Sequence, residues 1–261
     1  MSIKQYQIDA FATKVFEGNP ATVCPLEKWL DDKILQAIAE ENNLSETAFF
    51  VPSKKGFYLR WFAPLAEVDL CGHATLASAY VLFDILNYSK PTITFETKSG
   101  GLVVSRDGQY LTMDFPIRIP RPSVIPEMLV EGLGRQPIDV FMADDYIAVF
   151  NTEEEIKSIK PDFTKLKELD LRGVVVTAKG DSVDFVSRMF GPKVGITEDP
   201  VTGSSHCALA PYWETKLGKK KFIARQVSKR GGEVLCEVRG NRVFLSGRAV
   251  KFMEAEIYLG T

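Results

Sequence analysis

Histidine and cysteine are scarce in this sequence of 261 residues. The chain has two histidines, His73 and His206, and four cysteines, none of which forms a Cys-x-x-Cys pair. Because transition metals in proteins are held mainly by imidazole and thiolate groups, this scarcity predicts a protein without a metal site. The scattered cysteines also predict free thiols, as in a reducing cytoplasm.

Other absences exclude further classes of protein. The net charge is −2 and no block of basic residues occurs, so there is no electrostatic case for a nucleic-acid or membrane partner. No run of about 18 apolar residues predicts a membrane span, and the first residues do not resemble a signal peptide. Neither Gly-x-Gly-x-x-Gly nor the phosphate-loop pattern occurs. We therefore expect a cytoplasmic protein without a cofactor.

What the sequence does contain is an internal repeat. An Arg-x-Phe-x-Pro block begins at Arg60 and again at Arg188, and a glycine loop follows each block, at Gly72 and Gly203. The blocks are 128 residues apart (188 − 60) and the glycines 131 (203 − 72), so a short insertion separates the two registers. A period this long is not a solenoid repeat. It indicates that one domain has been duplicated.

Short apolar segments bounded by glycine, proline or charged residues dominate the chain, and they predict strands. The expected strands include Lys4–Phe11, Ala48–Val51, Phe57–Phe62, Thr92–Phe95, Leu102–Val104 and Leu111–Phe115, with two more in Glu233–Leu245. Helical patterns are fewer. They cover Asp31–Asn42, Pro126–Glu131 with Gly132 just past its end, Glu153–Ile159 and Phe163–Leu169.

The segments that follow the two repeated glycines are apolar on every face. Residues 74–83 and 207–213 therefore predict two helices that are buried all round. We expect an α+β fold of two pseudo-symmetric half-domains, each an antiparallel sheet or barrel wrapped around a central helix. The expected N-terminal half-domain is 1–117, completed by a C-terminal strand 250–261, and the C-terminal half-domain is 118–249.

Each repeated glycine stands where a helix begins. Glycine lets the backbone approach a ligand closely, and the free N–H groups of a first helical turn attract anions. One such glycine could simply cap a buried helix, but the duplication supplies two. We therefore predict that Gly72 and Gly203 face one shared cleft, where they and Ser204 hold the anionic group of a substrate.

Glu46 is the first candidate for acid–base chemistry. Strand alternation places it on one face with Ala48 and Phe50, an apolar neighbourhood that suits a general acid or base. The simpler alternative is a solvated glutamate at the start of a strand. Asp199 is the second candidate, because Pro200 restrains it to an extended backbone just before the second glycine loop. An ordinary Asp-Pro turn is the alternative at this position.

The two histidines are expected to differ in role. His73 directly follows Gly72, where a helix N-terminus disfavours its charged form, and it could carry a proton or donate to a substrate. A hydrogen-bonded structural histidine beside an apolar helix is the simpler alternative. His206 lies deeper in its helix and is expected to pack or to support the site. Cys71 precedes Gly72, at a helix start that could activate a thiol, although a buried, inert cysteine is the simpler alternative.

A further set of ordered motifs extends over nearly the whole chain. They are Asp9-Ala10-Phe11, Gly18-Asn19-Pro20-Ala21, Leu44-Ser45-Glu46-Thr47-Ala48-Phe49, Cys71-Gly72-His73-Ala74-Thr75-Leu76-Ala77, Glu198-Asp199-Pro200-Val201-Thr202-Gly203-Ser204, Arg225-Gln226 and Ser228–Gly232. Together they resemble the phenazine-biosynthesis PhzF-like isomerases, a branch of the diaminopimelate-epimerase-like fold.

The resemblance implies a function and a site. Glu46 matches the family's acid/base residue, and His73, Asp199 and Ser204 match groups around the substrate, with Ser45 and the two loop glycines as further binding residues. In the phenazine enzyme these groups support a cofactor-free proton shift in a dihydro-hydroxyanthranilate. We therefore expect a metal-free, homodimeric isomerase of a small carboxylate.

Two other functions stay open. The first is an epimerase, racemase or dehydratase that uses Cys71, as in the wider superfamily. A two-thiol racemase requires a cysteine in both loops, whereas the second loop has Thr202 at the position that corresponds to Cys71. The second is a binding protein that has kept the fold and lost its reaction.

Overall fold

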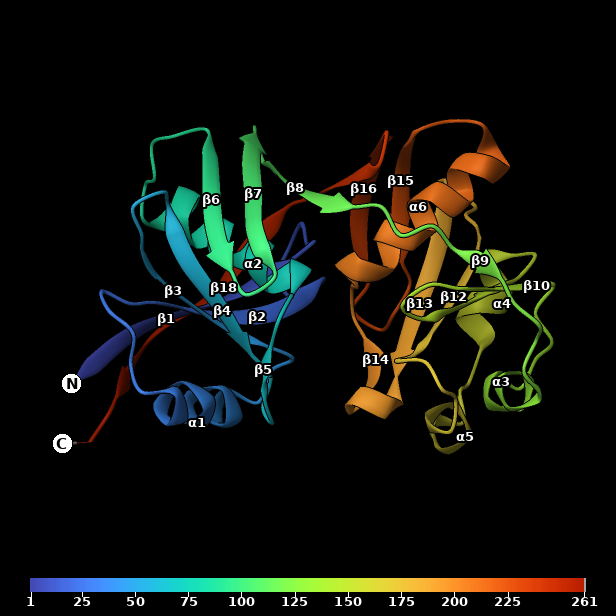
Figure 1. Ribbon diagram of the computed structural model, residues 1–261, viewed down its shortest axis with the longest axis horizontal. Coiled ribbons are helices and arrows are strands. Elements are labelled where there is room, and N and C mark those ends of the chain that lie inside the picture. Colours follow the sequence, from blue (N-terminus) through green and yellow to red (C-terminus); the bar gives the residue numbers. More distant parts are fainter. Residues whose placement is uncertain (261) are drawn as a thin grey trace. The chain divides into compact units, whose positions relative to one another are not determined.

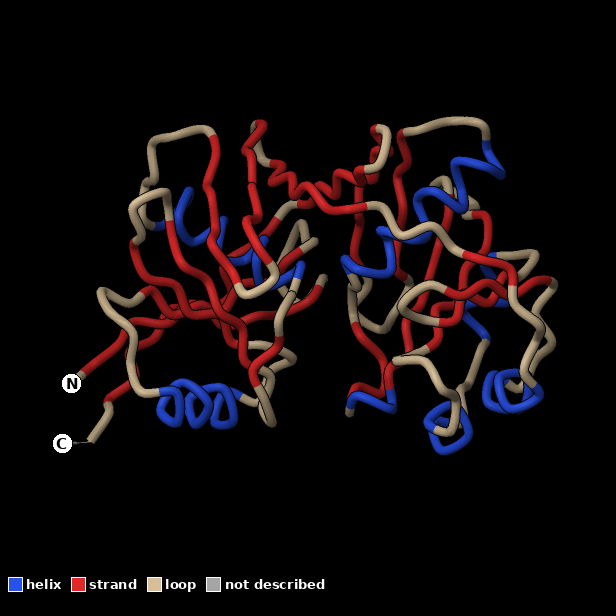
Figure 2. Tube along the Cα trace, in the orientation of Figure 1, coloured by secondary structure: helices blue, strands red, loops and turns tan. Residues whose placement is uncertain are grey.

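Strands account for most of the regular structure, and a few helices pack against them (Figure 2). The computed structural model describes residues 1–260. They form two compact units: the first is Met1–Asp114 with the segment from Ser246 onward, and the second is Phe115–Leu245. The expected α+β class is confirmed. That the expected half-domains fold independently stays a prediction, and limited proteolysis would test it.

The first unit contains α1, α2 and nine strands. The strands are β1 (Ser2–Ala10), β2 (Asn19–Pro25), β3 (Thr47–Pro52), β4 (Phe57–Phe62), β5 (Glu67–Val68), β6 (Thr92–Thr97), β7 (Gly100–Asp107), β8 (Tyr110–Pro116) and β18 (Ala249–Tyr258). The helices are α1 (Asp32–Asn42) and α2 (Gly72–Tyr80), which continues as a π-helical turn, η1 (Val81–Ile85).

The second unit has more helices. Its strands are β9 (Arg121–Pro122), β10 (Asp139–Met142), β11 (Tyr146–Val149), β12 (Val174–Lys179), β13 (Phe185–Gly191), β14 (Ile196–Asp199), β15 (Lys221–Gln226), β16 (Gly232–Arg239) and β17 (Arg242–Gly247). Its helices are α3 (Glu127–Leu133), α4 (Glu153–Ser158), α5 (Phe163–Lys167), the short 3₁₀ turn η2 (Pro192–Val194) and α6 (Gly203–Leu217).

The two units share one order of strand pairing. In the first, β2 pairs in parallel with β3, β3 antiparallel with β4, and β4 in parallel with β6. In the second, β11, β12, β13 and β15 repeat that parallel, antiparallel, parallel order. The expected antiparallel sheets are therefore wrong in this respect, because both sheets are mixed. Parallel neighbours need a crossover, which α1 and α2 supply in the first unit.

The apolar helix expected after Gly72 is α2, and it packs against β1, β2, β3 and β18. Its small side chains let the strands approach closely, while α1 covers the other side of the strands (Figure 1). Two buried hydroxyls on α2 are satisfied within the helix, since Thr75 and Ser78 donate to carbonyls one turn earlier, at 2.6 and 2.7 Å.

The second apolar helix, α6, runs on through Pro211. A proline has no N–H, so the carbonyl of Cys207 loses its partner within the helix. The backbone N–H of Arg118 supplies the missing donor, at 3.0 Å. This contact from outside the helix explains how α6 continues past a residue that usually ends one.

The end of α3 corrects one sequence expectation. Gly132 lies inside the helix, and the residue just past its end is Gly134, whose φ of +65° is the left-handed conformation of a helix C-cap. Gly132 is needed for a different reason. A Cβ there would lie 2.4 Å from Cδ2 of Leu166, so only glycine allows α3 to pack this closely on α5.

The two ends of the chain meet in the first unit. β18 pairs antiparallel with β1 along its whole length, from Ser2 opposite Tyr258 to Ala10 opposite Ala249. The C-terminal strand thus completes the first unit after the chain has formed all of the second. No helix in the described residues is both long and apolar enough to cross a bilayer.

Candidate active site

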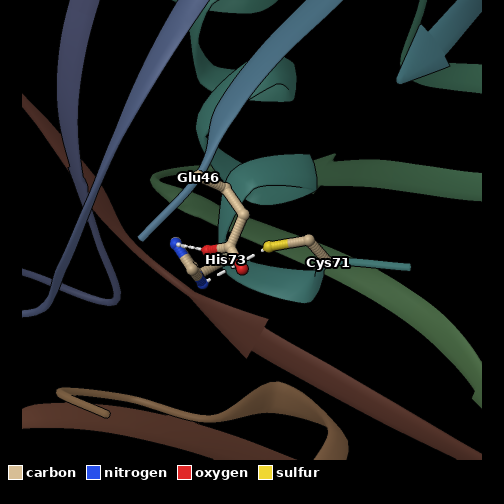
Figure 3. A group of neighbouring side chains, drawn as sticks. All are labelled: Glu46, Cys71 and His73. Carbon is tan, nitrogen blue, oxygen red and sulfur yellow. Dashed lines mark hydrogen bonds and ion pairs between the residues drawn. The ribbon is translucent and has the colours of Figure 1, made fainter. Parts of the chain in front are cut away.

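Glu46 directly precedes β3 instead of lying within it. Its carbonyl accepts a hydrogen bond from the N–H of Thr22 at 3.2 Å, which extends the parallel pairing of β2 with β3 by one residue. The Glu46 side chain is 12% exposed and lies toward α2, where its Oε2 is 3.2 Å from Nε2 of His73 (Figure 3). Ser45 is the preceding residue in the same turn.

His73 is the second residue of α2, and its protonation state follows from its contacts. Nδ2 of Asn19 lies 3.2 Å from Nδ1 of His73. An amide nitrogen can only donate, so Nδ1 is the acceptor and the ring hydrogen sits on Nε2. Burial lowers the pKa of His73 to about 3, which keeps the ring neutral at physiological pH.

The ring hydrogen of His73 therefore faces the Glu46 carboxylate. The 3.2 Å contact is close, but Nε2 has no well-aligned acceptor among the described residues. Hydrogen bonds in empty active sites are often poorly aligned and tighten when the substrate binds. His73 is thus a neutral donor beside a carboxylate.

Cys71 completes this group as the residue just before α2. Its Sγ lies 3.5 Å from Nδ1 of His73, on the other ring nitrogen from Glu46 (Figure 3). Among the described residues, these three side chains could together offer ligands to a metal ion, with one atom from each lying within 4.8 Å of the others. A single metal ion can bind only one nitrogen of the imidazole ring. The Cys71 thiol lies beside Nδ1 and the Glu46 carboxylate beside Nε2, so an ion bound to either nitrogen would be near only one of these two groups. The metal-free site stays a prediction.

The second glycine loop is organised around Asp199, the last residue of β14. The hydroxyl of Thr202 donates to Oδ2 of Asp199 at 2.5 Å. Gln226 ties the loop together: its Nε2 donates to the Asp199 carbonyl at 2.6 Å, and its Oε1 accepts from the N–H of Thr202 at 2.9 Å. The Thr202 hydroxyl therefore serves to hold Asp199 in place.

Ser204, the second residue of α6, is the counterpart of His73. Nη2 of Arg172 donates to its Oγ at 3.1 Å. Arg172 is itself held by Asp145 through two hydrogen bonds, of 2.9 and 2.6 Å. These two residues were missed by sequence reasoning, because nothing in the local sequence marks an arginine before a strand as part of a site.

His206 lies one turn into α6 and supports the loop. Its Nδ1 lies 2.8 Å from the Thr202 carbonyl, which can only accept, so Nδ1 carries the hydrogen. The ring is fully buried next to Phe185, and burial lowers its pKa to about 4. The expected supporting role agrees with these contacts.

The candidate residues thus form one cluster within each unit. The first holds Glu46, Cys71, Gly72 and His73, and the second holds Asp199, Gly203 and Ser204. The shared cleft for Gly72 and Gly203 stays a prediction.

Comparison with known proteins decides the family. The family model described as phenazine biosynthesis-like protein matches residues 8–255. The chain belongs to the phenazine biosynthesis-like family. An uncharacterized isomerase of Pseudomonas aeruginosa is 52% identical to it, over 99% of this chain and 100% of the relative. This family member is an enzyme, an isomerase, as the sequence led us to expect.

Solved structures agree with the fold. A PhzF-family protein from Enterococcus faecalis superposes with a TM-score of 0.97 at 49% identity, over 99% of this chain and 100% of that one. A hydroxyproline epimerase from Agrobacterium vitis, solved with trans-4-hydroxy-L-proline bound, has a TM-score of 0.65 at 10% identity, covering 98% of this chain and 92% of that one. The second likeness shows a shared fold alone. The expected relation to the epimerase-like fold is confirmed.

Proposed function

We propose that this isomerase moves a proton between two carbons of a small carboxylate-bearing substrate, with Glu46 as the acid/base and with no cofactor. The observation that carries the proposal is the contact between Glu46 and His73 at the start of α2. A carboxylate that is nearly buried and faces a neutral donor is suited to accept a proton from carbon and to return it.

The neighbours of Glu46 supply the remaining parts of the reaction. His73 donates from Nε2 to the carbanion or enolate that forms when the proton leaves, because its tautomer is fixed by Asn19. In the second unit, Asp199 orients the substrate or shuttles a proton. Gly72, Gly203 and Ser204 hold the substrate's anionic group at the helix N-termini, with Ser45 as a further contact.

The test is exchange of a carbon-bound proton with solvent. The purified protein is incubated in D₂O with dihydro-hydroxyanthranilate, the substrate of the phenazine enzyme, and with other small carboxylates that carry an acidic C–H bond. Mass spectrometry and ¹H NMR then report deuterium on carbon. We expect exchange with at least one of them. The Glu46→Gln protein should lose it, while Glu41→Gln, which changes an exposed glutamate on α1, should keep it.

One observation favours a second candidate, a Cys71-dependent epimerase or dehydratase. The thiol lies 3.5 Å from a histidine nitrogen, as a nucleophilic or basic cysteine would require. Against it, His73 has a pKa of about 3 and is a weak base, and Thr202 holds Asp199 where a second thiol would stand. Exchange that survives Glu46→Gln but not Cys71→Ser would favour the thiol enzyme.

The proposed setting is a cytoplasmic homodimer in a biosynthetic pathway. The free thiols and the family resemblance support this setting: Cys24, Cys71, Cys207 and Cys236 are buried and form no disulfide among the described residues. Analytical ultracentrifugation would test the assembly, since a single species of one chain mass would contradict the dimer.

A further inference from the structure

A guanidinium group beside the second glycine loop is not used by the acid/base mechanism. We propose that Arg172, fixed by Asp145, positions the hydroxyl of Ser204 and binds the substrate's carboxylate together with it. This inference rests on the proposed function in one respect, that the substrate carries a carboxylate, and it assigns the residues that recognise that group.

Asp145 acts as the anchor. It is 4% exposed, and its two oxygens accept from Nε and Nη2 of Arg172 in the bidentate geometry that fixes a guanidinium plane. The backbone holds both partners in register, because the N–H of Tyr146 donates to the carbonyl of Gly173 at 3.0 Å. Asp145 and Arg172 therefore sit at the starts of two adjacent parallel strands, β11 and β12.

Ser204 is oriented by this pair. Because Nη2 of Arg172 donates to Oγ of Ser204, one lone pair of the hydroxyl is occupied and its hydrogen must point elsewhere. That hydrogen has no acceptor among the described residues, and the same is true of both hydrogens on Nη1 of Arg172. The Arg172 side chain is 37% exposed, so the guanidinium-bearing side chain is partly open to solvent.

The donors match a carboxylate in number. Two oxygens of one carboxylate can accept from Nη1 and from the serine hydroxyl, beside the first N–H groups of α6. Asp145 neutralises most of the guanidinium charge. Recognition therefore depends on hydrogen-bond geometry more than on net charge, which favours a planar carboxylate over a spherical anion such as chloride.

The repeat provides an independent reason to place Arg172 in the site. Thr47 pairs with Phe62 and Val174 pairs with Phe190, the two phenylalanines of the repeated Arg-x-Phe-x-Pro blocks. Counting back one residue from each strand makes Gly173 the equivalent of Glu46. Counting back two makes Arg172 the equivalent of Ser45. The same corner that carries the acid/base in the first unit thus carries a cation in the second.

The experiment measures binding without turnover. Acetate is titrated into the ¹⁵N-labelled protein at constant ionic strength, with chloride as the balancing anion, and the resonances of the Ser204 amide and the Arg172 side chain are followed. We expect a saturable shift in the wild-type protein. The Arg172→Gln and Ser204→Ala proteins should bind acetate at least ~10-fold more weakly, the scale of one charge-assisted hydrogen bond.

Three further proteins make the outcome specific. Arg172→Lys keeps the charge but loses the fork geometry, so it should recover only part of the affinity. Arg135→Gln makes the same change at a surface ion pair of the second unit and should bind like the wild type. Glu46→Gln should also bind acetate normally, which separates this inference from the proposed proton transfer. A wild-type protein without saturable binding, or a folded Arg172→Gln protein with unchanged affinity, would overturn the assignment.

Discussion

The two glycine loops are supported by the same pair of residues, an arginine and a glutamate, but the side chains in the loops themselves are different. In both units the arginine of the Arg-x-Phe-x-Pro block donates two hydrogen bonds to a glutamate of the next strand, and we call each such pair a clamp. The pairs are Arg60 with Glu67, at 2.7 and 2.9 Å, and Arg188 with Glu198, at 2.7 and 3.1 Å. Each clamp fixes the strand that leads into the loop. The side chains of the loop itself have meanwhile diverged.

The divergence separates two tasks. The first loop holds a carboxylate, an imidazole and a thiol in contact, which are groups that can exchange protons. The second holds an arginine–serine pair and an aspartate fixed by Gln226. Under the proposed function, one half of the duplicated fold specialises in proton transfer and the other in binding. Each of the following changes tests that division.

The largest effect is expected from Glu46→Gln. Loss of the acid/base should reduce turnover by ~10²-fold or more, since general acid/base groups contribute on that scale. Steady-state kinetics measures it, and circular dichroism checks the fold. If the variant turns over at the wild-type rate, proton transfer does not belong to the first loop.

The two clamps should contribute to stability by similar amounts. Replacing Arg60 or Arg188 with Met removes both hydrogen bonds of the clamp, although Glu67 keeps Lys98 as a second partner. Each change should cost about 2 kcal/mol in the free energy of unfolding. Hydrogen exchange should locate the loss in the first unit for one variant and in the second for the other. Losses that spread equally over both units would contradict two local clamps.

The Arg60 clamp also predicts a pH dependence. Its hydrogen bonds to Glu67 lower the pKa of that carboxyl to about 2 from its ordinary value of 4.5. Because the folded-state pKa is depressed, this stabilisation is present above pH 4.5 and is lost as the pH falls toward 2. The difference between wild type and Arg60→Met, measured by urea unfolding, should shrink across that window. A difference that stays constant would show that packing, and not charge, is responsible.

The residues that position His73 and Asp199 should affect different kinetic constants. Asn19→Leu removes the donor that fixes the His73 tautomer, and Gln226→Met removes the amide that holds Asp199. We expect Asn19→Leu to lower kcat by about 10-fold, the value of one well-placed hydrogen bond. Only Asn19→Leu should disturb proton exchange from carbon. Gln226→Met should chiefly raise KM if the second loop binds the substrate.

Buried histidines provide a smaller test through stability. His206 has a pKa of about 4 and His73 of about 3, both below the unfolded value of 6.5. The unfolded chain therefore binds more protons, and the free energy of unfolding should fall as the pH falls below 6.5, by about 1 kcal/mol per histidine between pH 7 and 5.5. When the free energy of unfolding is measured by urea at several pH values, it should change with pH about half as steeply in His206→Gln as in the wild-type protein. An unchanged slope would mean that His206 is not held neutral.

The smallest effect is expected from Cys71→Ser. Serine keeps a hydrogen bond to His73 but forms no ready anion, so a carboxylate mechanism predicts a loss of less than about 3-fold. Two results together would instead assign proton transfer to the Cys71 thiol. They are rapid inactivation of the native enzyme by iodoacetamide and loss of turnover in a folded Cys71→Ser protein.

The sequence was most informative where the chemistry is local. The buried helices after Gly72 and Gly203 follow from continuous apolar runs, and Asp31 was recognisable as the start of α1, where it accepts from the N–H of Lys33. The parallel pairing of β2 with β3 was not predictable in this way. Period-2 alternation records which face of a strand is buried and carries no information on the direction of its neighbour.

The site residues also divide into those that a local motif predicts and those that only the tertiary structure brings to the site. Glu46, His73 and Asp199 lie in motifs that can be read along the chain. Arg172 reaches Ser204 across 32 positions in the sequence, from the end of β12 that the register with β11 places beside Asp145. Contacts of this kind are created by the register of the sheet. The two repeats, aligned through their strands, would have pointed to Arg172 beside the equivalent of Glu46.

The pairing of β1 with β18 has a consequence for how the protein is made. During synthesis the second unit is complete once Leu245 has left the ribosome, whereas the first unit still lacks its last strand. Domains fold as units during translation, and long-range strand pairing is slow. The half that carries Glu46 is therefore the last to mature, although most of it emerges first. Nascent chains stalled before residue 249 should contain a protease-resistant second unit and an unprotected Glu46 loop.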